Sequence, residues 1–226
     1  MMPEYLSPNF GPRRGGASPK FVMIHYTDMA TNKRALDRLC DPGAEVSAHY
    51  LISRWGQLFH LVPEDMRAWH AGVGSYAGIA DMNSHSIGIE LDHPGGAWPT
   101  MCYAPAQLQI LLSLVRTITM KWSIPRQNII GHSDFAPGRK MDPGPNFPWD
   151  MLAHHGFGFL LPGQFDRDLQ AEPDDLSFLG YDVAIHGAEA CMEAYAQHFM
   201  GLMSAPRDLL LSHLAATLAC NGTLLR

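Results

Sequence analysis

The chain has 226 residues, enough for one domain or for one domain with an accessory module. Its hydrophobic fraction is 46% and its charged fraction is 17%, so we expect a packed core and not a disordered chain. The net charge of -6 argues against a general nucleic-acid-binding protein, because such proteins carry a basic surface.

Residues 1–10 lack a basic segment followed by an apolar one, so no secretory signal is expected. No run approaches the roughly 20 apolar residues that a membrane span needs. These features predict a cytoplasmic protein, or a periplasmic one if the sequence given lacks its signal. The four cysteines form no CxxC pair, which leaves isolated thiols or a disulfide: Cys40, Cys102, Cys191 and Cys220.

Apolar runs and turn residues predict the elements of the first third of the chain. They are an extended lead-in over residues 1–19, a buried strand over 20–26, a helix over 31–40, strands over 48–53 and 57–62 joined as a hairpin, one helical turn over 64–69 and a loop over 73–85. Thr31 is a suitable N-cap for the helix. His25 lies at the carboxyl end of the first strand, where open sheets place ligands.

A strand is also predicted over residues 86–92, where apolar side chains alternate with Ser86, Gly88 and Glu90. This second face therefore carries two small residues and one acidic side chain. It fits the floor of a groove with one carboxylate projecting into it. It equally fits an edge strand whose polar face is exposed to water.

The most regular helical pattern covers residues 104–122, and a short strand over 128–132 follows it. That strand leads into residues 131–149, which are so rich in Pro and Gly that we expect neither a regular helix nor a central strand. This stiffened loop carries His132, Lys140 and Asp142 at fixed offsets.

Strands that alternate with helices predict an α/β fold, with a mixed central β-sheet flanked by helices over residues 1–160. The composition changes after Trp149, and residues 161–163 are typical of a linker. Residues 173–180, 188–200 and 206–220 then predict helices only, so we expect a small all-α C-terminal module over residues 164–226.

Two histidines and one aspartate are a legitimate ligand set for Zn²⁺ that leaves a fourth position open for water. His25, His132 and Asp142 supply such a set. Glu90 and Lys140 are suitable in type as a base and as a cation for an oxyanion. Spacing alone leaves other interpretations open: His132 and Asp142 can simply form turns, and the chain offers rival ligands at His49, His60, His70, His85 and His93.

The chain resembles the zinc-dependent N-acetylmuramoyl-L-alanine amidases of the amidase type 2 family, which share a fold with peptidoglycan recognition proteins and T7 lysozyme. The resemblance rests on Ser-Pro-Asn-Phe at 7–10, Ile-His-Tyr-Thr at 24–27, Ser-Ala-His-Tyr-Leu at 47–51, Ala-Trp-His-Ala-Gly at 68–72, Asn83, Ser-Ile-Gly-Ile-Glu-Leu at 86–91 and nearly all of 131–149. The C-terminal module resembles, more weakly, a helical peptidoglycan-binding domain at residues 179–182 and 194–199.

The resemblance implies a role for each matching residue. It implies Zn²⁺ as cofactor, held by His25, His132 and Asp142, with Glu90 as the catalytic acid and base and Lys140 as the cation that stabilises the oxyanion. It also implies that the substrate is contacted by residues on groove-lining segments, namely Tyr26, Tyr50, Trp69, His70, Ala71 and Asn83.

The implied reaction is hydrolysis of the amide between N-acetylmuramic acid, including its 1,6-anhydro form, and L-alanine of the stem peptide. We favour a role in muropeptide recycling. The alternatives are a cell-envelope amidase that acts on intact peptidoglycan, and a non-catalytic peptidoglycan receptor on the same fold. The expected partner is a muropeptide or peptidoglycan, with no nucleic acid, no membrane span and no protein partner inferred.

Overall fold

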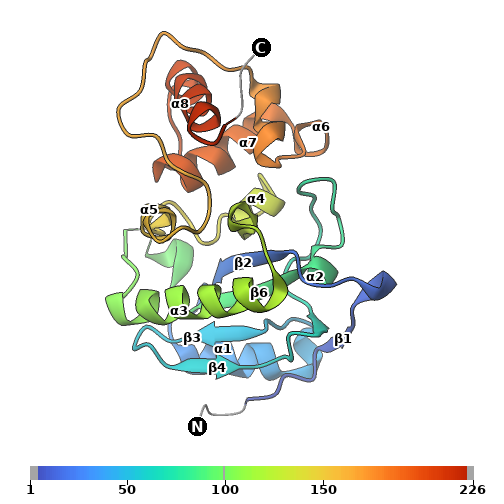
Figure 1. Ribbon diagram of the computed structural model, residues 1–226. Coiled ribbons are helices and arrows are strands. Elements are labelled where there is room, and N and C mark those ends of the chain that lie inside the picture. Colours follow the sequence, from blue (N-terminus) through green and yellow to red (C-terminus); the bar gives the residue numbers. More distant parts are fainter. Residues whose placement is uncertain (1–4, 99, 223–226) are drawn as a thin grey trace.

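The structure, a computed structural model, describes residues 5–98 and 100–222 and is built around a five-stranded mixed sheet (Figure 1). The strand order is β4-β3-β6-β2-β7. Its strands are β2 Phe21–Tyr26, β3 Tyr50–Ile52, β4 Leu58–His60, β6 Ser86–Leu91 and β7 Ile129–Gly131. Four strands are parallel and β4 is antiparallel to β3, which confirms the predicted mixed α/β sheet and the hairpin.

Strand β6 lies inside the sheet, with β3 on one side and β2 on the other. The edge-strand interpretation of residues 86–92 is therefore wrong. Parallel pairing with β2 places His25 opposite Glu90, and paired residues point to the same face of a sheet. The small and acidic face of β6 thus lies beside the histidine.

A second, two-stranded sheet joins β1 Phe10–Pro12 to β5 Met66–Ala68. The prediction of a helical turn over residues 64–69 is wrong, because residues 66–68 pair with a strand of the lead-in. That pairing spans more than fifty residues of sequence and leaves no local pattern.

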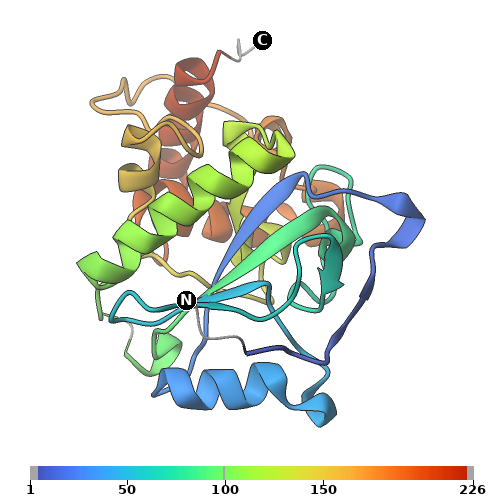
Figure 2. The same cartoon turned by 60° about the horizontal axis from the view of Figure 1, so that its bottom comes forward.

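Helices cover both faces of the central sheet (Figure 2). Helix α3, Pro105–Trp122, packs on the face that carries Ile24 and Ile89. Helix α1, Asn32–Cys40, packs on the opposite face over β3 and β4. Its first turn is capped as predicted, since the Thr31 hydroxyl accepts a hydrogen bond from the backbone N–H of Arg34.

The loop over residues 131–149 contains one short helix, α4 His132–Phe135, and α5, Trp149–His154, begins at its end. The expectation that no helix forms there is wrong for four residues, because the first proline of the loop comes only at Pro137. Helix α2, Met82–His85, likewise lies in a predicted loop. Short 3-10 helices occupy Arg14–Gly16, Pro42–Ala44, Gly95–Ala97 and Arg126–Asn128.

The C-terminal region is helical, as predicted. It contains a 3-10 helix Pro173–Leu179, α6 Val183–His186, α7 Ala188–Tyr195, a π-helix Ala196–Met200 and α8 Arg207–Cys220. Its apolar side chains form one buried cluster with Met23 and Ile130 of the sheet. The two predicted units, residues 1–160 and 164–226, include some positions that lie outside the described residues, namely 1–4, 99 and 223–226.

All four cysteines are free thiols, and Cys191 is buried. Among the described residues, no helix combines the length and the apolar character that crossing a membrane requires.

Candidate metal centre and cavity

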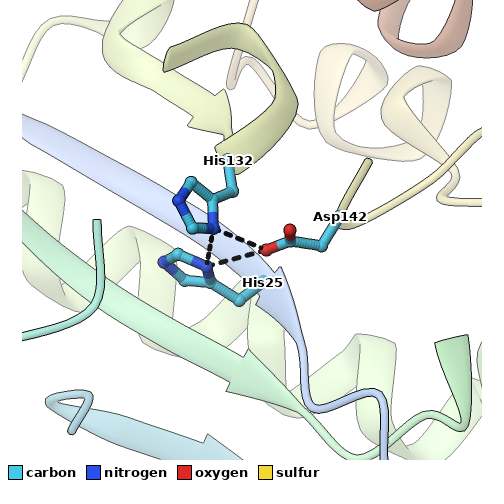
Figure 3. Close-up of side chains that lie close together, drawn as sticks. All are labelled: His25, His132 and Asp142. Atoms are coloured by element: carbon cyan, nitrogen blue, oxygen red, sulfur yellow. Dashed lines mark hydrogen bonds and ion pairs between the residues drawn. The ribbon is translucent and has the colours of Figure 1, made fainter. Parts of the chain in front are cut away.

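Three buried side chains converge on one point at the carboxyl edge of the central sheet (Figure 3). The Nδ1 atoms of His25 and His132 lie 3.0 Å apart, and the Asp142 Oδ2 atom lies 2.8 Å from the first and 3.0 Å from the second. The three residues are 2%, 3% and 6% exposed. Three donor atoms that face one another in a buried space are the arrangement of a metal site.

The fold explains why residues so far apart in sequence meet here. His25 ends β2 and His132 directly follows β7, and these two parallel strands are neighbours. The loop that follows closes on itself, because the Ser133 backbone N–H donates to the Asp142 carbonyl at 2.9 Å. Gly131 permits the close approach, since a Cβ there would lie 2.8 Å from Pro143.

The pKa values of His25 and Asp142 suit metal binding. Burial lowers the pKa of His25 to about 4, so its ring is neutral at neutral pH. Burial alone would raise the pKa of Asp142, but the adjacent His132 and His25 outweigh it and hold that pKa well below its usual range. His132 Nε2 lies 2.7 Å from the Ala71 carbonyl, which can only accept a hydrogen bond, so Nε2 carries a proton. Histidine and carboxylate ligands bind a metal in their deprotonated forms, which the low pKa values of His25 and Asp142 favour.

The donor atoms open into a cavity of about 460 Å³ that also reaches Glu90, Lys140, Tyr26 and Trp69. Glu90 Oε2 is buried and has no hydrogen-bond partner among the described residues. Burial, and then the Asp142 charge, raise the pKa of Glu90 well above its ordinary value, while Lys140 opposes that shift. A poorly solvated carboxylate of raised pKa in a cavity is a candidate proton acceptor.

The six residues expected to contact substrate do not all lie at the cavity. Three of them line it, namely Tyr26, Trp69 and His70. Ala71 is buried, and the Asn83 side chain accepts hydrogen bonds from the backbone N–H groups of His70 and Ala71 at 2.9 and 2.8 Å. These two therefore shape the segment beneath the cavity.

Tyr50 is not brought to the site. Its side chain lies in the core against α3, on the other face of the sheet, and its hydroxyl donates to Glu64 at 2.8 Å. The reason is the strand alternation: Tyr50 pairs with Ile89, whereas Glu90 pairs with Leu51. Because β3 is buried on both faces, its sequence gives no sign of which face Tyr50 takes.

The rival histidines make other contacts. His49 accepts from the Gly88 N–H, His60 stacks on Tyr50, and His85 and His93 bond to backbone carbonyls. His70 contacts His25 through ring nitrogens 3.0 Å apart but lies outside the ligand triad.

The sequence reasoning missed Arg139, which lines the cavity and donates to the carbonyls of Ala71 and Val73. It thereby ties the ligand loop to the segment that follows Trp69. Its position directly before Lys140 is the one signal that points to it.

Residues 15–145 match the Amidase_2 family model, which is described as N-acetylmuramoyl-L-alanine amidase. The chain is 39% identical over 188 residues to the N-acetylmuramoyl-L-alanine amidase AmiD of Escherichia coli K12, which covers 73% of this chain and 67% of AmiD. It is 36% identical over 160 residues to the 1,6-anhydro-N-acetylmuramyl-L-alanine amidase AmpD of Salmonella typhimurium SL1344, which covers 63% of this chain and 83% of AmpD.

Among solved structures, AmiD from E. coli in complex with the substrate anhydro-N-acetylmuramic acid-L-Ala-D-gamma-Glu-L-Lys has a TM-score of 0.75 to this chain, at 28% identity. The match covers 96% of this chain and 99% of that one, so the likeness extends over the C-terminal helices.

Proposed function

Because the chain belongs to the N-acetylmuramoyl-L-alanine amidase family, we propose that it uses Zn²⁺ to release the stem peptide from 1,6-anhydro-muropeptides during peptidoglycan recycling. Family membership confirms the predicted hydrolase of the amide between N-acetylmuramic acid and L-alanine. The observation that carries the proposal is the buried His-His-Asp donor set beside an unpartnered carboxylate in one cavity.

The proposed ligands are His25, His132 and Asp142, a set of nitrogen and oxygen donors that suits the borderline-soft zinc ion. When bound, a zinc ion supplies Lewis acidity, which polarises a carbonyl and makes water more acidic. The remaining chemistry falls to the side chains of the cavity.

Glu90 is the proposed proton carrier. It accepts the proton of the attacking water and returns it to the amine nitrogen of the leaving L-alanine. The raised pKa of Glu90 favours this role, because a base whose pKa lies closer to the working pH both accepts and returns a proton readily.

Lys140 is the proposed oxyanion partner. It lines the same cavity, and among the described residues its ammonium group forms no ion pair, so its charge is available to the substrate. A positioned cation stabilises the negative charge that develops on the carbonyl oxygen in the transition state. Tyr26 and Trp69, on the cavity wall, are proposed to contact the muramyl sugar or the stem peptide.

The choice of the anhydro substrate rests on two relatives. AmpD is named for the 1,6-anhydro form, and the AmiD structure holds an anhydro-muropeptide. The alternative is a cell-envelope amidase that acts on intact peptidoglycan, which would suit a C-terminal module that resembles a peptidoglycan-binding domain at residues 179–182 and 194–199. In either case we propose residues 1–160 as the catalytic unit and 164–226 as its helical module.

Product analysis by mass spectrometry tests the proposal. Purified protein is incubated with a defined 1,6-anhydro-muropeptide and, separately, with insoluble sacculi. We expect faster release of free peptide from the soluble substrate, loss of release after chelation, and recovery with added Zn²⁺. Release that survives complete metal removal contradicts the metal role, and faster turnover of sacculi favours the cell-envelope alternative. Fractionation of the native producer tests the predicted cytoplasmic location.

A further inference from the structure

We infer that Arg38, on helix α1, is a specificity-determining residue that binds a carboxylate of the stem peptide, so that the enzyme prefers stems in which this acid is free. The inference rests on the proposed function and deepens it, because it names the part of the substrate that one cavity residue recognises. The position of α1, the cations of the cavity and the charge of the substrate support it.

Helix α1 forms one wall of the cavity that contains the proposed metal ligands. Its buried Leu39 lies in one apolar cluster with Leu51 of β3, and Leu51 pairs with Glu90, so α1 covers the same sheet face as that carboxylate. Ala35, Arg38 and Leu39 line the cavity. Positions three and four residues apart share one face of a helix, so the exposed side chain of Arg38 stands at the rim on the cavity side.

Three lysine or arginine side chains line this cavity, and two of them already have a role. Arg139 donates to the carbonyls of Ala71 and Val73. Lys140 is the proposed oxyanion partner. The third, Arg38, forms neither an ion pair nor a hydrogen bond with any other residue that the structure describes. Its guanidinium is therefore available to an anion that enters the cavity.

Three carboxylates share a surface hollow with Arg38, but each has another partner. Asp28 and Asp41 each accept a hydrogen bond from a backbone N–H, at 3.1 and 2.9 Å. Asp37 is paired with Lys33, one helical turn away, at 2.8 Å. Their negative charge opposes a general attraction of anions, so recognition requires direct contact with Arg38. A planar guanidinium matches a carboxylate in geometry, because it can donate two parallel hydrogen bonds.

The substrate carries its negative charge on the peptide side. The carboxyl group of the muramyl unit is consumed in the scissile amide, whereas a glutamate joined through its γ-carboxyl keeps a free α-carboxylate. The substrate in the AmiD structure has such a stem, L-Ala-D-gamma-Glu-L-Lys. Its α-carboxylate lies about two residues, or roughly 7 Å, beyond the scissile bond, so a cation that binds it belongs in the same cavity as the metal ligands. The terminal carboxylate of the lysine is the second possible source.

Steady-state kinetics on three matched substrates test the assignment. The first is anhydro-N-acetylmuramic acid-L-Ala-D-gamma-Glu-L-Lys, the second has the glutamate α-carboxylate amidated, and the third has the lysine carboxylate amidated. We expect kcat/KM to be about 10-fold lower for the second, chiefly through KM, because this ion pair forms equally in the ground state and the transition state. A fall for the third substrate instead identifies the terminal carboxylate as the bound group. Equal kcat/KM for all three substrates overturns the inference.

Variants of α1 assign the preference to one side chain. Arg38→Gln should fold, because glutamine is a good helix former at an exposed site, and should hydrolyse the first and second substrates equally well. Arg38→Lys keeps the charge without the planar fork and should restore part of the preference. Arg34→Gln is the matched control, because it removes the same charge one turn earlier, outside the cavity lining, and should keep the wild-type preference. A preference that survives in Arg38→Gln overturns the inference.

Binding measurements separate this inference from the proposed function. Calorimetric titration of the zinc-loaded Glu90→Gln protein, with and without Arg38→Gln, measures the preference between the first two substrates in the absence of turnover. An Arg38-dependent preference in binding, with no peptide release by the wild-type protein, sinks the proposed function alone. Peptide release without any such preference sinks the role of Arg38 alone.

Discussion

Replacing Glu90 by Gln should slow turnover steeply while raising the stability of the metal-free protein. An amide cannot accept the proton of the attacking water. Loss of a general base typically costs 10²- to 10⁴-fold, which corresponds to roughly 3 to 5 kcal/mol of activation free energy. Zinc should be retained, because Glu90 is not one of the three convergent donors.

The stability effect follows from the raised pKa of Glu90. Between its ordinary value of 4.5 and its higher folded value, the folded state binds more protons than the unfolded state. The free energy of unfolding therefore falls as the pH rises through that window. The amide of the Glu90→Gln variant carries no charge at any pH. A buried polar group without a partner costs about 1 to 3 kcal/mol, more when it is charged, and each kcal/mol shifts the Tm of a chain this long by about 2 to 4 °C.

Glu64→Gln is the matched control, for which we expect a change in Tm of the opposite sign. Glu64 is also buried, and burial alone would raise its pKa, but hydrogen bonds from Lys121, Trp122 and Tyr50 lower it below the ordinary value. Its contribution to stability is present at neutral pH and is lost as the pH falls below that ordinary value. The Gln variant should lower the Tm and leave turnover intact, because Glu64 lies beside α3 on the other face of the sheet.

Two assays decide the comparison: peptide release from a defined anhydro-muropeptide, and calorimetric unfolding of chelator-treated protein between pH 5 and 8. Wild-type turnover in Glu90→Gln refutes the proton-carrier role. Tm shifts of the same sign in the two variants refute the electrostatic reasoning, since only one of these carboxylates has partners that compensate its charge.

Three further outcomes are expected. Lys140→Gln should reduce kcat about 10²- to 10³-fold with zinc content unchanged by metal analysis, because the lost charge acts on the transition state. Gly88→Ala should cost about 1 to 3 kcal/mol in chemical denaturation and weaken zinc binding, because its methyl group displaces the His70 ring, whereas Gly163→Ala, with open space around it, should change neither. Tyr181→Phe should cost about 1 to 3 kcal/mol in the same unfolding assay, because it removes a hydroxyl that donates to a buried carboxylate at 2.6 Å.

Local patterns made His25, His132 and Asp142 candidate ligands, because the ends of the predicted strands over 20–26 and 128–132 meet at one edge of a parallel sheet. Spacing left the rival histidines open, and the family resemblance selected these three residues. The alternation along residues 86–92 placed Glu90 on a small face. The position of this face beside His25 depends on the register of β6 against β2, which no local pattern carries.

Two of the errors, at residues 66–68 and at Tyr50, share one physical cause, which is pairing between distant segments. Residues 66–68 form a strand only because the lead-in supplies its partner. Tyr50 turns away from the cavity because of its register against Ile89. A fully buried strand is apolar on both faces, so its composition cannot tell one face from the other.

The C-terminal helices contribute to the candidate metal centre through a carboxylate that the sequence reasoning did not single out. Asp134 is buried two residues after His132, and its oxygens accept from the Gly131 N–H, the Tyr181 hydroxyl and His198 Nδ1 at 2.7, 2.6 and 2.7 Å. Two of these donors belong to the helical region. Removing one partner of a buried charge is costly, because the charge stays behind without compensation. The helices therefore stabilise the start of the ligand loop, and this role holds whether or not they also bind glycan.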